Sequence, residues 1–266
     1  MAQTILGLDL GSRSVKAVLL DSTLRGWTVA GAARVPVPPS PEGEERPLRD
    51  RQAAAVRELV AARGWSPDTV VLAVPGAAAA SHVVTLPFSD PRRIEQTIAF
   101  EVEAQIPFEL SEVAWDWQPM SVRDGRSELY VGVVRKEELA GLLGALAPAG
   151  IDPRAVVPAA AAYASLFGQG LLAAEPAPTP EVPAPATAIL DVGHERASVC
   201  VVAAGSCEAA RTFGFGGAHV VRALARDLAL AEADAALLLG AELDGVAPPE
   251  PLAALAAEPR AAEALR

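Results

Sequence analysis

The stretch Thr4-Ile5-Leu6-Gly7-Leu8-Asp9-Leu10-Gly11-Ser12-Arg13-Ser14-Val15-Lys16-Ala17-Val18-Leu19-Leu20 decides the fold of this chain. An apolar run enters an Asp-Leu-Gly-Ser turn and a second apolar run leaves it, which is the pattern of a β-hairpin. Gly11 lets the backbone approach a ligand closely, and successive N–H groups of such a turn can form an anion-binding nest. The stretch therefore predicts a hairpin that binds the phosphates of a nucleotide.

The side chains of this hairpin supply further chemistry. Ser12 and Ser14 add hydroxyl donors, and Lys16 adds a point positive charge. Asp9, at the end of the first strand, is expected to hold a magnesium ion through water. Only Lys16 and Lys136 are lysines among 22 basic residues. The alternative for Lys16 is a solvated strand residue, because the period-two alternation can point it outward. Neither a Walker loop nor a dinucleotide fingerprint occurs in the chain.

A second segment, 188–202, repeats this arrangement around Asp191-Val192-Gly193. The two Asp-x-Gly turns lie 182 positions apart. One such turn is weak evidence, because Asp and Gly are ordinary turn residues, but a matched pair between apolar strands is stronger. The pair predicts a duplicated architecture with the ligand between two halves. Asp9 and Asp191 would then share one metal–phosphate complex.

The two hairpins resemble the phosphate motifs of the actin-like ATPase superfamily. Within it, the chain resembles the family of PilM, from type IV pilus assembly, and the cytoplasmic part of GspL, from type II secretion. Four stretches carry this narrower match, and they are 70–76, 86–88, 100–108 and 215–219. The E-x-E-x-x-I-P-F segment that ends at Phe108 is the most specific, and the resemblance covers about residues 4–225.

The resemblance implies a set of nucleotide-binding residues and a fold. The residues are Asp9, Gly11, Ser12, Ser14, Lys16, Asp191, Gly193, Gly216 and Gly217, with Asp9 and Asp191 as water-mediated magnesium ligands. The fold is α/β, an actin-like (ribonuclease-H-like) two-lobed fold with an inserted small α/β subdomain. We expect the domains to be 1–81 with 152–172 (first lobe), 82–151 (inserted partner-binding subdomain), 173–187 (proline-rich linker) and 188–266 (second lobe).

Local patterns predict the elements within these domains. Three strands are expected within 4–35, and the last of them spans 27–35. Further strands are expected at 70–74, 113–122 and 128–134, and helices at 49–63, 91–106, 136–147 and 218–230. Gly64 is expected to end the first helix, and Asp90 with Pro91 to begin the second.

Composition excludes several classes of protein. The formal charge of −11 opposes nonspecific nucleic-acid binding, because no basic stripe exists to displace counterions. Two cysteines in 266 residues argue against a disulfide framework and fit a reducing cytoplasm. The first residues lack the charged region of a signal peptide. The uncharged segment 156–174 is interpreted as a buried alanine-rich helix ending near Gly168, not as a membrane span.

Two gaps in the pattern argue against turnover. The segment 157–163 matches the helix where the superfamily carries a water-orienting acid or amide, and it holds no Asp, Glu, Gln or Asn. No Gly-rich adenosine turn follows residue 217, so the second lobe is expected to be incomplete. ATP and magnesium are therefore expected to bind this chain weakly or not at all, and no hydrolysis is expected.

Other candidate sites have competing interpretations. His194 with Cys200 and Cys207 matches no zinc-ligand spacing, and Cys200 is interpreted as core packing. Arg13 and His194 are interpreted either as phosphate contacts or as solvated turn residues. Trp115 and Trp117 are expected to pack in the core, and the alternative is an aromatic patch for a partner.

Three classes of function remain. The favoured one is a GspL-like cytoplasmic scaffold at the inner membrane, which links platform proteins to the assembly ATPase of a secretion or pilus system and has no membrane span of its own. A PilM-like ATP-binding pilus assembly protein is the close alternative. An actin-like ATPase or kinase with turnover is disfavoured, and so is a filament-forming protein, because the chain shows no amphipathic tail. A homodimer is left open.

Overall fold

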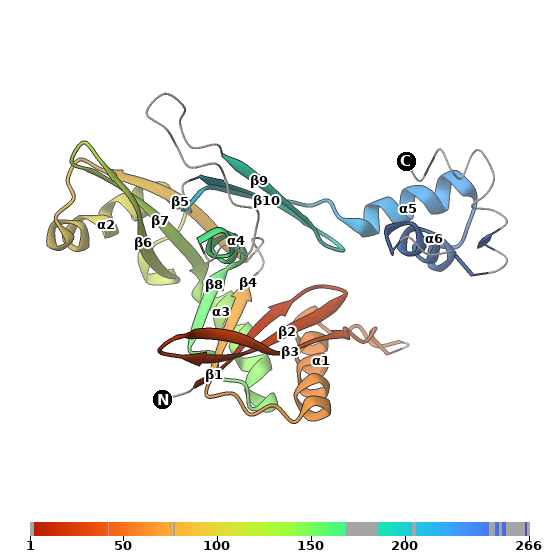
Figure 1. Ribbon diagram of the computed structural model, residues 1–266. Helices are drawn as coiled ribbons and strands as arrows, with labels where there is room; N and C mark the ends of the chain where they lie inside the picture. Colours follow the sequence, from red (N-terminus) through yellow and green to blue (C-terminus); the bar gives the residue numbers. More distant parts are fainter. Residues whose placement is uncertain are drawn as a thin grey trace. The chain divides into compact units, whose positions relative to one another are not determined.

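The computed structural model of the chain describes residues 3–41, 43–74, 76, 78–168, 186–203, 206–244, 248–249, 252–253 and 264 (Figure 1). The chain divides into two compact units. The first unit contains Met1–Asp191 and Ser198–Thr212, and the second contains Val192–Ala197 and Phe213–Arg266. The mixed α/β architecture that the sequence predicts is confirmed, whereas the exact domain boundaries stay a prediction. Most of the predicted linker, 173–185, lies outside the described residues.

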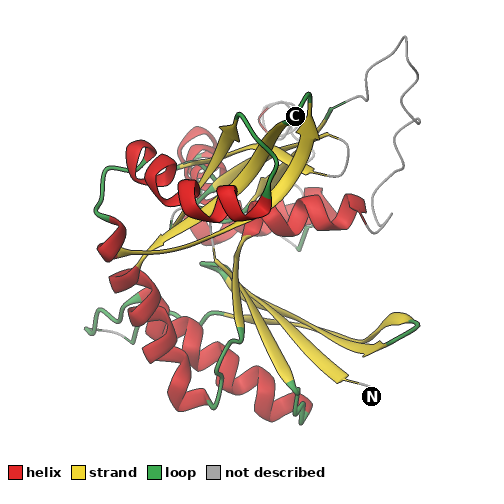
Figure 2. Ribbon diagram, turned by 90° about the vertical axis from the view of Figure 1, so that its left-hand side faces the viewer, coloured by secondary structure: helices red, strands yellow, loops and turns green. Residues whose placement is uncertain are grey.

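A five-stranded sheet carries the predicted phosphate hairpin. Its strands are β1 (Gln3–Leu10), β2 (Ser14–Thr23), β3 (Gly26–Pro36), β4 (Thr69–Val74) and β8 (Ala155–Pro158), in the order β3-β2-β1-β4-β8. Strands β1 and β2 are antiparallel, with Asp9 opposite Lys16, which confirms the hairpin. Strands β4 and β8 extend the sheet in parallel to β1. Helices α1 (Leu48–Arg63) and α3 (Lys136–Leu146) cover one face of this sheet (Figure 2).

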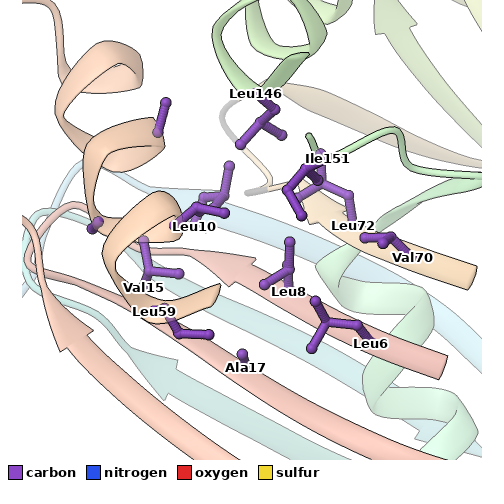
Figure 3. Close-up of a cluster of buried hydrophobic side chains, with 13 residues drawn as sticks. Leu6, Leu8, Leu10, Val15, Ala17, Leu59, Val70, Leu72, Leu146 and Ile151 are labelled. Carbon is purple, nitrogen blue, oxygen red and sulfur yellow. The ribbon is translucent and has the colours of Figure 1, made fainter. Parts of the chain in front are cut away.

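The core of this sheet follows from alternation along β1. Leu6, Leu8 and Leu10 point to the same face and are at most 3% exposed, as period two requires. They meet Leu59 of α1 and Leu72 of β4 in one buried cluster (Figure 3). Helix α1 ends at Gly64, as expected. That glycine adopts the left-handed conformation and donates its N–H to the Val60 carbonyl. The 3-10 turn η2 (Ala147–Ala149) follows α3.

A second sheet is formed by the inserted segment. Strands β5 (Ala79–Leu86), β6 (Val113–Arg123) and β7 (Arg126–Arg135) pair in the order β5-β7-β6. Asp124 and Gly125 both have positive φ, as a tight two-residue hairpin turn requires. The 3-10 turn η1 (Leu110–Glu112) precedes β6.

Helix α2 (Pro91–Gln105) packs on this second sheet. It starts as predicted, because the Asp90 carboxylate accepts a hydrogen bond from the Arg93 N–H at 3.0 Å. Its predicted apolar stripe is buried in one cluster with residues of the sheet. Trp115 and Trp117 are partly buried against the same cluster, which confirms their interpretation as core packing.

Alanine-rich helix α4 (Ala159–Gly168) packs with a third sheet. The strands are β9 (Thr187–Val192), β10 (Ala197–Ala203) and β11 (Ser206–Phe213), in the order β11-β10-β9. Cys200 and Cys207 are buried in the shared cluster, and their sulfur atoms lie 3.2 Å apart. Cys200 is therefore core packing, as interpreted. Helix α4 ends at Gly168, where the sequence predicts it, and none of the described helices has the length and apolar character needed to cross a membrane.

Helices α5 (Gly217–Leu228) and α6 (Glu232–Asp244) belong to the second unit. Val221, Leu224 and Ala225 on one stripe of α5 are buried in a cluster with Ala235 of α6. Such a one-sided stripe is what an amphipathic helix presents to its partner. Helix α5 ends at Ala229, which adopts the left-handed conformation.

Candidate functional site

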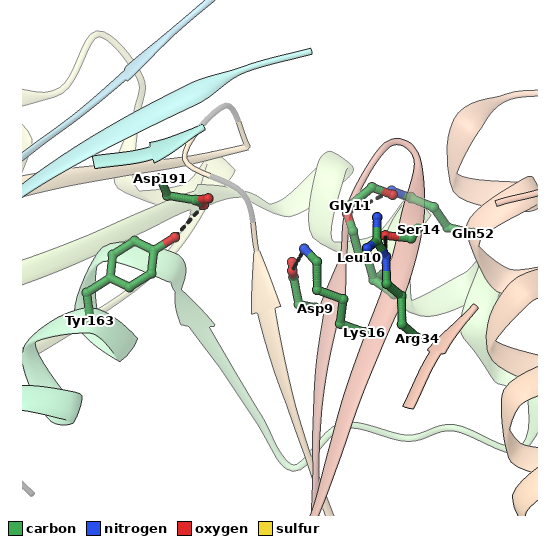
Figure 4. A network of polar contacts seen from close by, with 9 residues as sticks. All are labelled: Asp9, Leu10, Gly11, Ser14, Lys16, Arg34, Gln52, Tyr163 and Asp191. Atoms are coloured by element: carbon green, nitrogen blue, oxygen red, sulfur yellow. Dashed lines mark hydrogen bonds and ion pairs between the residues drawn. The ribbon is translucent and has the colours of Figure 1, made fainter. Parts of the chain in front are cut away.

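The β1–β2 hairpin places a cation and a carboxylate side by side. The Lys16 Nζ lies 2.7 Å from the Asp9 Oδ2 (Figure 4). Their side chains are 54% and 49% exposed, so the pair is open to a ligand from solvent. A surface pair of this kind contributes less than about 1 kcal/mol to stability, which leaves both groups free to re-pair with a phosphate or a metal.

The turn between the two strands is fixed by contacts that leave no room for a larger residue. A Cβ at Gly11 would lie 2.7 Å from the Ser14 carbonyl oxygen, so the close approach requires glycine. The buried Gln52 side chain of α1 donates hydrogen bonds to the carbonyls of Leu10 at 2.8 Å and Gly11 at 3.1 Å. Helix α1 therefore holds the turn in place from the core side (Figure 4).

The two serines of the turn have different environments. Ser14 is 6% exposed, and its Oγ accepts a hydrogen bond from the Arg34 Nε at 3.1 Å. Ser12 is only half-buried, and Arg13 is exposed. Of the predicted hydroxyl donors, Ser12 is therefore the one that a ligand can reach without displacing Arg34.

Tyr163 links helix α4 to the second Asp-x-Gly turn. Its hydroxyl donates a hydrogen bond of 2.5 Å to the Asp191 Oδ2 (Figure 4). Burial raises the pKa of Tyr163, and the bond to Asp191 and the negative charges of Asp191 and Asp9 raise it further. The hydroxyl is therefore protonated at neutral pH and acts as a donor. The charge of Asp9 also acts on this hydroxyl, and Figure 4 shows Asp9, Lys16, Tyr163 and Asp191 in one network of polar side chains of the first unit.

The remaining predicted glycines lie together in the second unit. The Gly217 N–H donates to the Gly193 carbonyl at 2.9 Å, and the Gly193 N–H donates to the Arg196 carbonyl at 2.9 Å. The Gly216 N–H donates to the Nδ1 of His219 at 3.2 Å. These N–H groups already have partners, so an anion in this unit would be bound by side chains first.

A cavity of about 440 Å³ lies beside these glycines, within the second unit. Its charged and titratable lining residues are His194, Glu195, Arg196, His219, Arg222 and Glu232. Imidazole and guanidinium groups bind phosphate oxygens, and carboxylates accept hydrogen bonds from hydroxyls. His194 lines the cavity, which favours its interpretation as a ligand contact. Arg13 is exposed and does not line this cavity.

Five residues around the two Asp-x-Gly turns and the cavity were not predicted from the sequence. Gln52 and Arg34 secure the first turn, and Tyr163 contacts Asp191. Arg222 and Glu232 line the cavity. Gln52 carried a signal, since a polar residue on the buried stripe of an otherwise apolar helix face needs a hydrogen-bond partner.

The carboxylates of the first unit suit magnesium. Mg²⁺ keeps several of its waters and is bound through one or two carboxylates, and Asp9 and Asp191 provide two. No group of three or more His, Cys, Asp or Glu side chains that could hold a metal occurs among the described residues. Bound magnesium would neutralise charge on the nucleotide phosphates.

Replacing Gly216 by alanine is expected to disrupt the turn of the second unit. The new Cβ would lie 2.6–2.7 Å from backbone atoms of His194, Glu195 and Arg196, and backbone cannot rotate away as a side chain can. Overpacking of this kind costs about 1–3 kcal/mol. Hydrogen exchange should show faster exchange of the Gly193 and Gly217 amides. Gly214→Ala is the matched control, because nothing lies within 4 Å of its Cβ. Equal exchange in the two variants would contradict the close packing described here.

Comparison with known proteins identifies similar chains. The type IV pilus assembly protein PilM family matches residues 7–238. A solved PilM–PilN type IV pilus biogenesis complex contains a chain 26% identical to this one, with a TM-score of 0.69 over 87% of this chain and 68% of that one. The cytoplasmic domain of EpsL, an inner-membrane component of the type II secretion system of Vibrio cholerae, is 14% identical with a TM-score of 0.47, over 86% of this chain and 78% of that one.

Proposed function

Because this chain belongs to the type IV pilus assembly protein PilM family, whose match spans residues 7–238, we propose that it is a cytoplasmic scaffold of a pilus or secretion platform at the inner membrane. The actin-like fold that the sequence predicts agrees with membership of this family. The family match supports the PilM-like form of this proposal, in which the scaffold assembles a pilus. The GspL-like form, which the sequence favoured, stays a prediction.

The proposal includes nucleotide binding that is weak, as expected from the sequence, and that proceeds without turnover. Asp9, Lys16 and Asp191 supply the carboxylates and the cation that a magnesium–phosphate group needs, and they are accessible from solvent. Where a hydrolase of this superfamily would hold a water-orienting acid or amide, helix α4 offers the Tyr163 hydroxyl, which is already bonded to Asp191. A neutral tyrosine donor cannot accept the proton of an attacking water, which supports binding without hydrolysis.

The partner proposed for the scaffold is a PilN-like protein of the inner-membrane platform. The solved complex contains PilM together with PilN. One chain of that complex is 26% identical to this chain. The segment 82–151 is the proposed docking region. It exposes Phe100 on α2, which is 71% exposed, and large exposed aromatics are enriched at protein interfaces.

The experiment measures binding of the full chain to a purified PilN-like protein. Phe100→Ala is expected to weaken binding at least tenfold, because interface aromatics commonly contribute about 2 kcal/mol or more. Leu24→Ala is the control, since Leu24 is 99% exposed and lies outside 82–151. Unchanged binding by Phe100→Ala would remove α2 from the interface, and no binding by the unaltered chain would contradict the scaffold proposal.

A further inference from the structure

Tyr163 lies where a buried cluster meets the proposed nucleotide site. Its ring packs against the cluster that contains Ala164, Cys200 and Cys207, so its position is set by the core. Its hydroxyl leaves that cluster and donates to the Asp191 Oδ2 at 2.5 Å (Figure 4). Asp191 itself is exposed at the end of β9. A residue fixed by the core thus holds a carboxylate that faces solvent.

The hydrogen bond restrains the orientation of the exposed Asp191 carboxylate. The Asp9 carboxylate belongs to the same network of polar side chains in the first unit (Figure 4). An exposed Asp side chain without such a donor can adopt other rotamers. One donor on Oδ2 leaves Oδ1, which takes no hydrogen bond from the described residues, to meet a metal-bound water.

We propose that Tyr163 is a positioning residue for magnesium: it holds the Asp191 carboxylate beside Asp9 so that both can bind the waters of one ion. This inference rests on the proposed nucleotide binding and deepens it. Hydrogen bonds from outer-shell groups generally orient metal-binding carboxylates. The loss of such a hydrogen bond lowers metal affinity about 10–100-fold. Tyr163 touches neither nucleotide nor metal in this role.

Tyr163→Phe tests the role, because phenylalanine keeps the ring in the cluster and removes only the hydroxyl. Calorimetry with ATP is run with and without magnesium. The gain in ATP affinity that magnesium gives is expected to fall about tenfold in Tyr163→Phe, while the affinity for metal-free ATP stays unchanged. A merely structural role would lower both affinities together. Tyr130→Phe is the matched control, since Tyr130 is the only other tyrosine and its hydroxyl pairs with Ser81 at 2.6 Å.

A second measurement needs no nucleotide. With ¹³Cζ-labelled tyrosine the chain gives two signals, one for each tyrosine. Asp191→Asn is expected to shift the Tyr163 signal and leave the Tyr130 signal in place. An unmoved Tyr163 signal would overturn the contact and with it the inference.

The two proposals fail in different ways. If the unaltered chain binds magnesium–ATP and magnesium raises the ATP affinity of Tyr163→Phe by the same factor, this inference is wrong and nucleotide binding stands. If the unaltered chain binds no ATP with or without magnesium, the nucleotide part of the proposed function is wrong and the positioning role falls with it.

Discussion

Replacing Lys16 by alanine is expected to lower the affinity for magnesium–ATP by about tenfold to a hundredfold. A charge-assisted hydrogen bond to phosphate contributes about 1.5–3 kcal/mol, and each 1.4 kcal/mol is a factor of ten. The change also removes the cation that lies 2.7 Å from Asp9, which leaves an uncompensated carboxylate beside the phosphates. Both effects weaken binding of an anion. Calorimetry on the full chain measures the change.

Lys136→Ala is the control for this prediction. Lys136 is the only other lysine, and its Nζ, at the start of α3, donates to the Ser111 carbonyl of η1 at 2.8 Å. That variant is expected to bind ATP as the unaltered chain does. Equal losses in the two variants would indicate a general effect of net charge, and no loss in Lys16→Ala would remove the β1–β2 hairpin from the nucleotide site.

Replacing Leu72 by alanine is expected to lower the free energy of unfolding of the first unit by about 2–5 kcal/mol. Leu72 is fully buried in β4, among residues of β1 and α1 (Figure 3). Truncation removes buried apolar surface and leaves a cavity that two strands and a helix cannot collapse to fill. Urea denaturation of both proteins measures the difference.

The same substitution at Leu24 is the control. Leu24 is 99% exposed in the β2–β3 turn, so truncating its side chain removes no buried apolar surface. Its effect is expected to stay within about 0.5 kcal/mol. A Leu72 variant as stable as the Leu24 variant would contradict the buried cluster described for the five-stranded sheet.

The parts of the fold that the sequence predicted have local causes. The hairpin around Gly11, the start of α2 at Asp90 and the end of α1 at Gly64 are each set by residues within a few positions of one another. Alternation along β1 also predicted which of its side chains are buried. These features depend on backbone sterics and on period, so one sequence is enough to find them.

The parts that escaped prediction join residues distant in the chain. Gln52 bonds to a carbonyl 42 positions earlier, and Tyr163 bonds to a carboxylate 28 positions later. The cavity of the second unit combines a turn near His194 with Glu232 of α6. Such contacts depend on how strands and helices are arranged in space, and no local pattern specifies that arrangement. Tyr163 lies in the segment 157–163, which has no carboxylate or amide, and its contact with Asp191 depends on the same kind of arrangement.

The two hydrogen bonds from Gln52 have a mechanical consequence. The side-chain amide ties the carbonyls of Leu10 and Gly11 to a helix whose far side faces solvent. A rearrangement of those carbonyls must either move the helix as well or break both bonds, and breaking the buried bond to Leu10 leaves polar groups without a partner. The turn is therefore anchored to helix α1, and a change in the position of one constrains the position of the other.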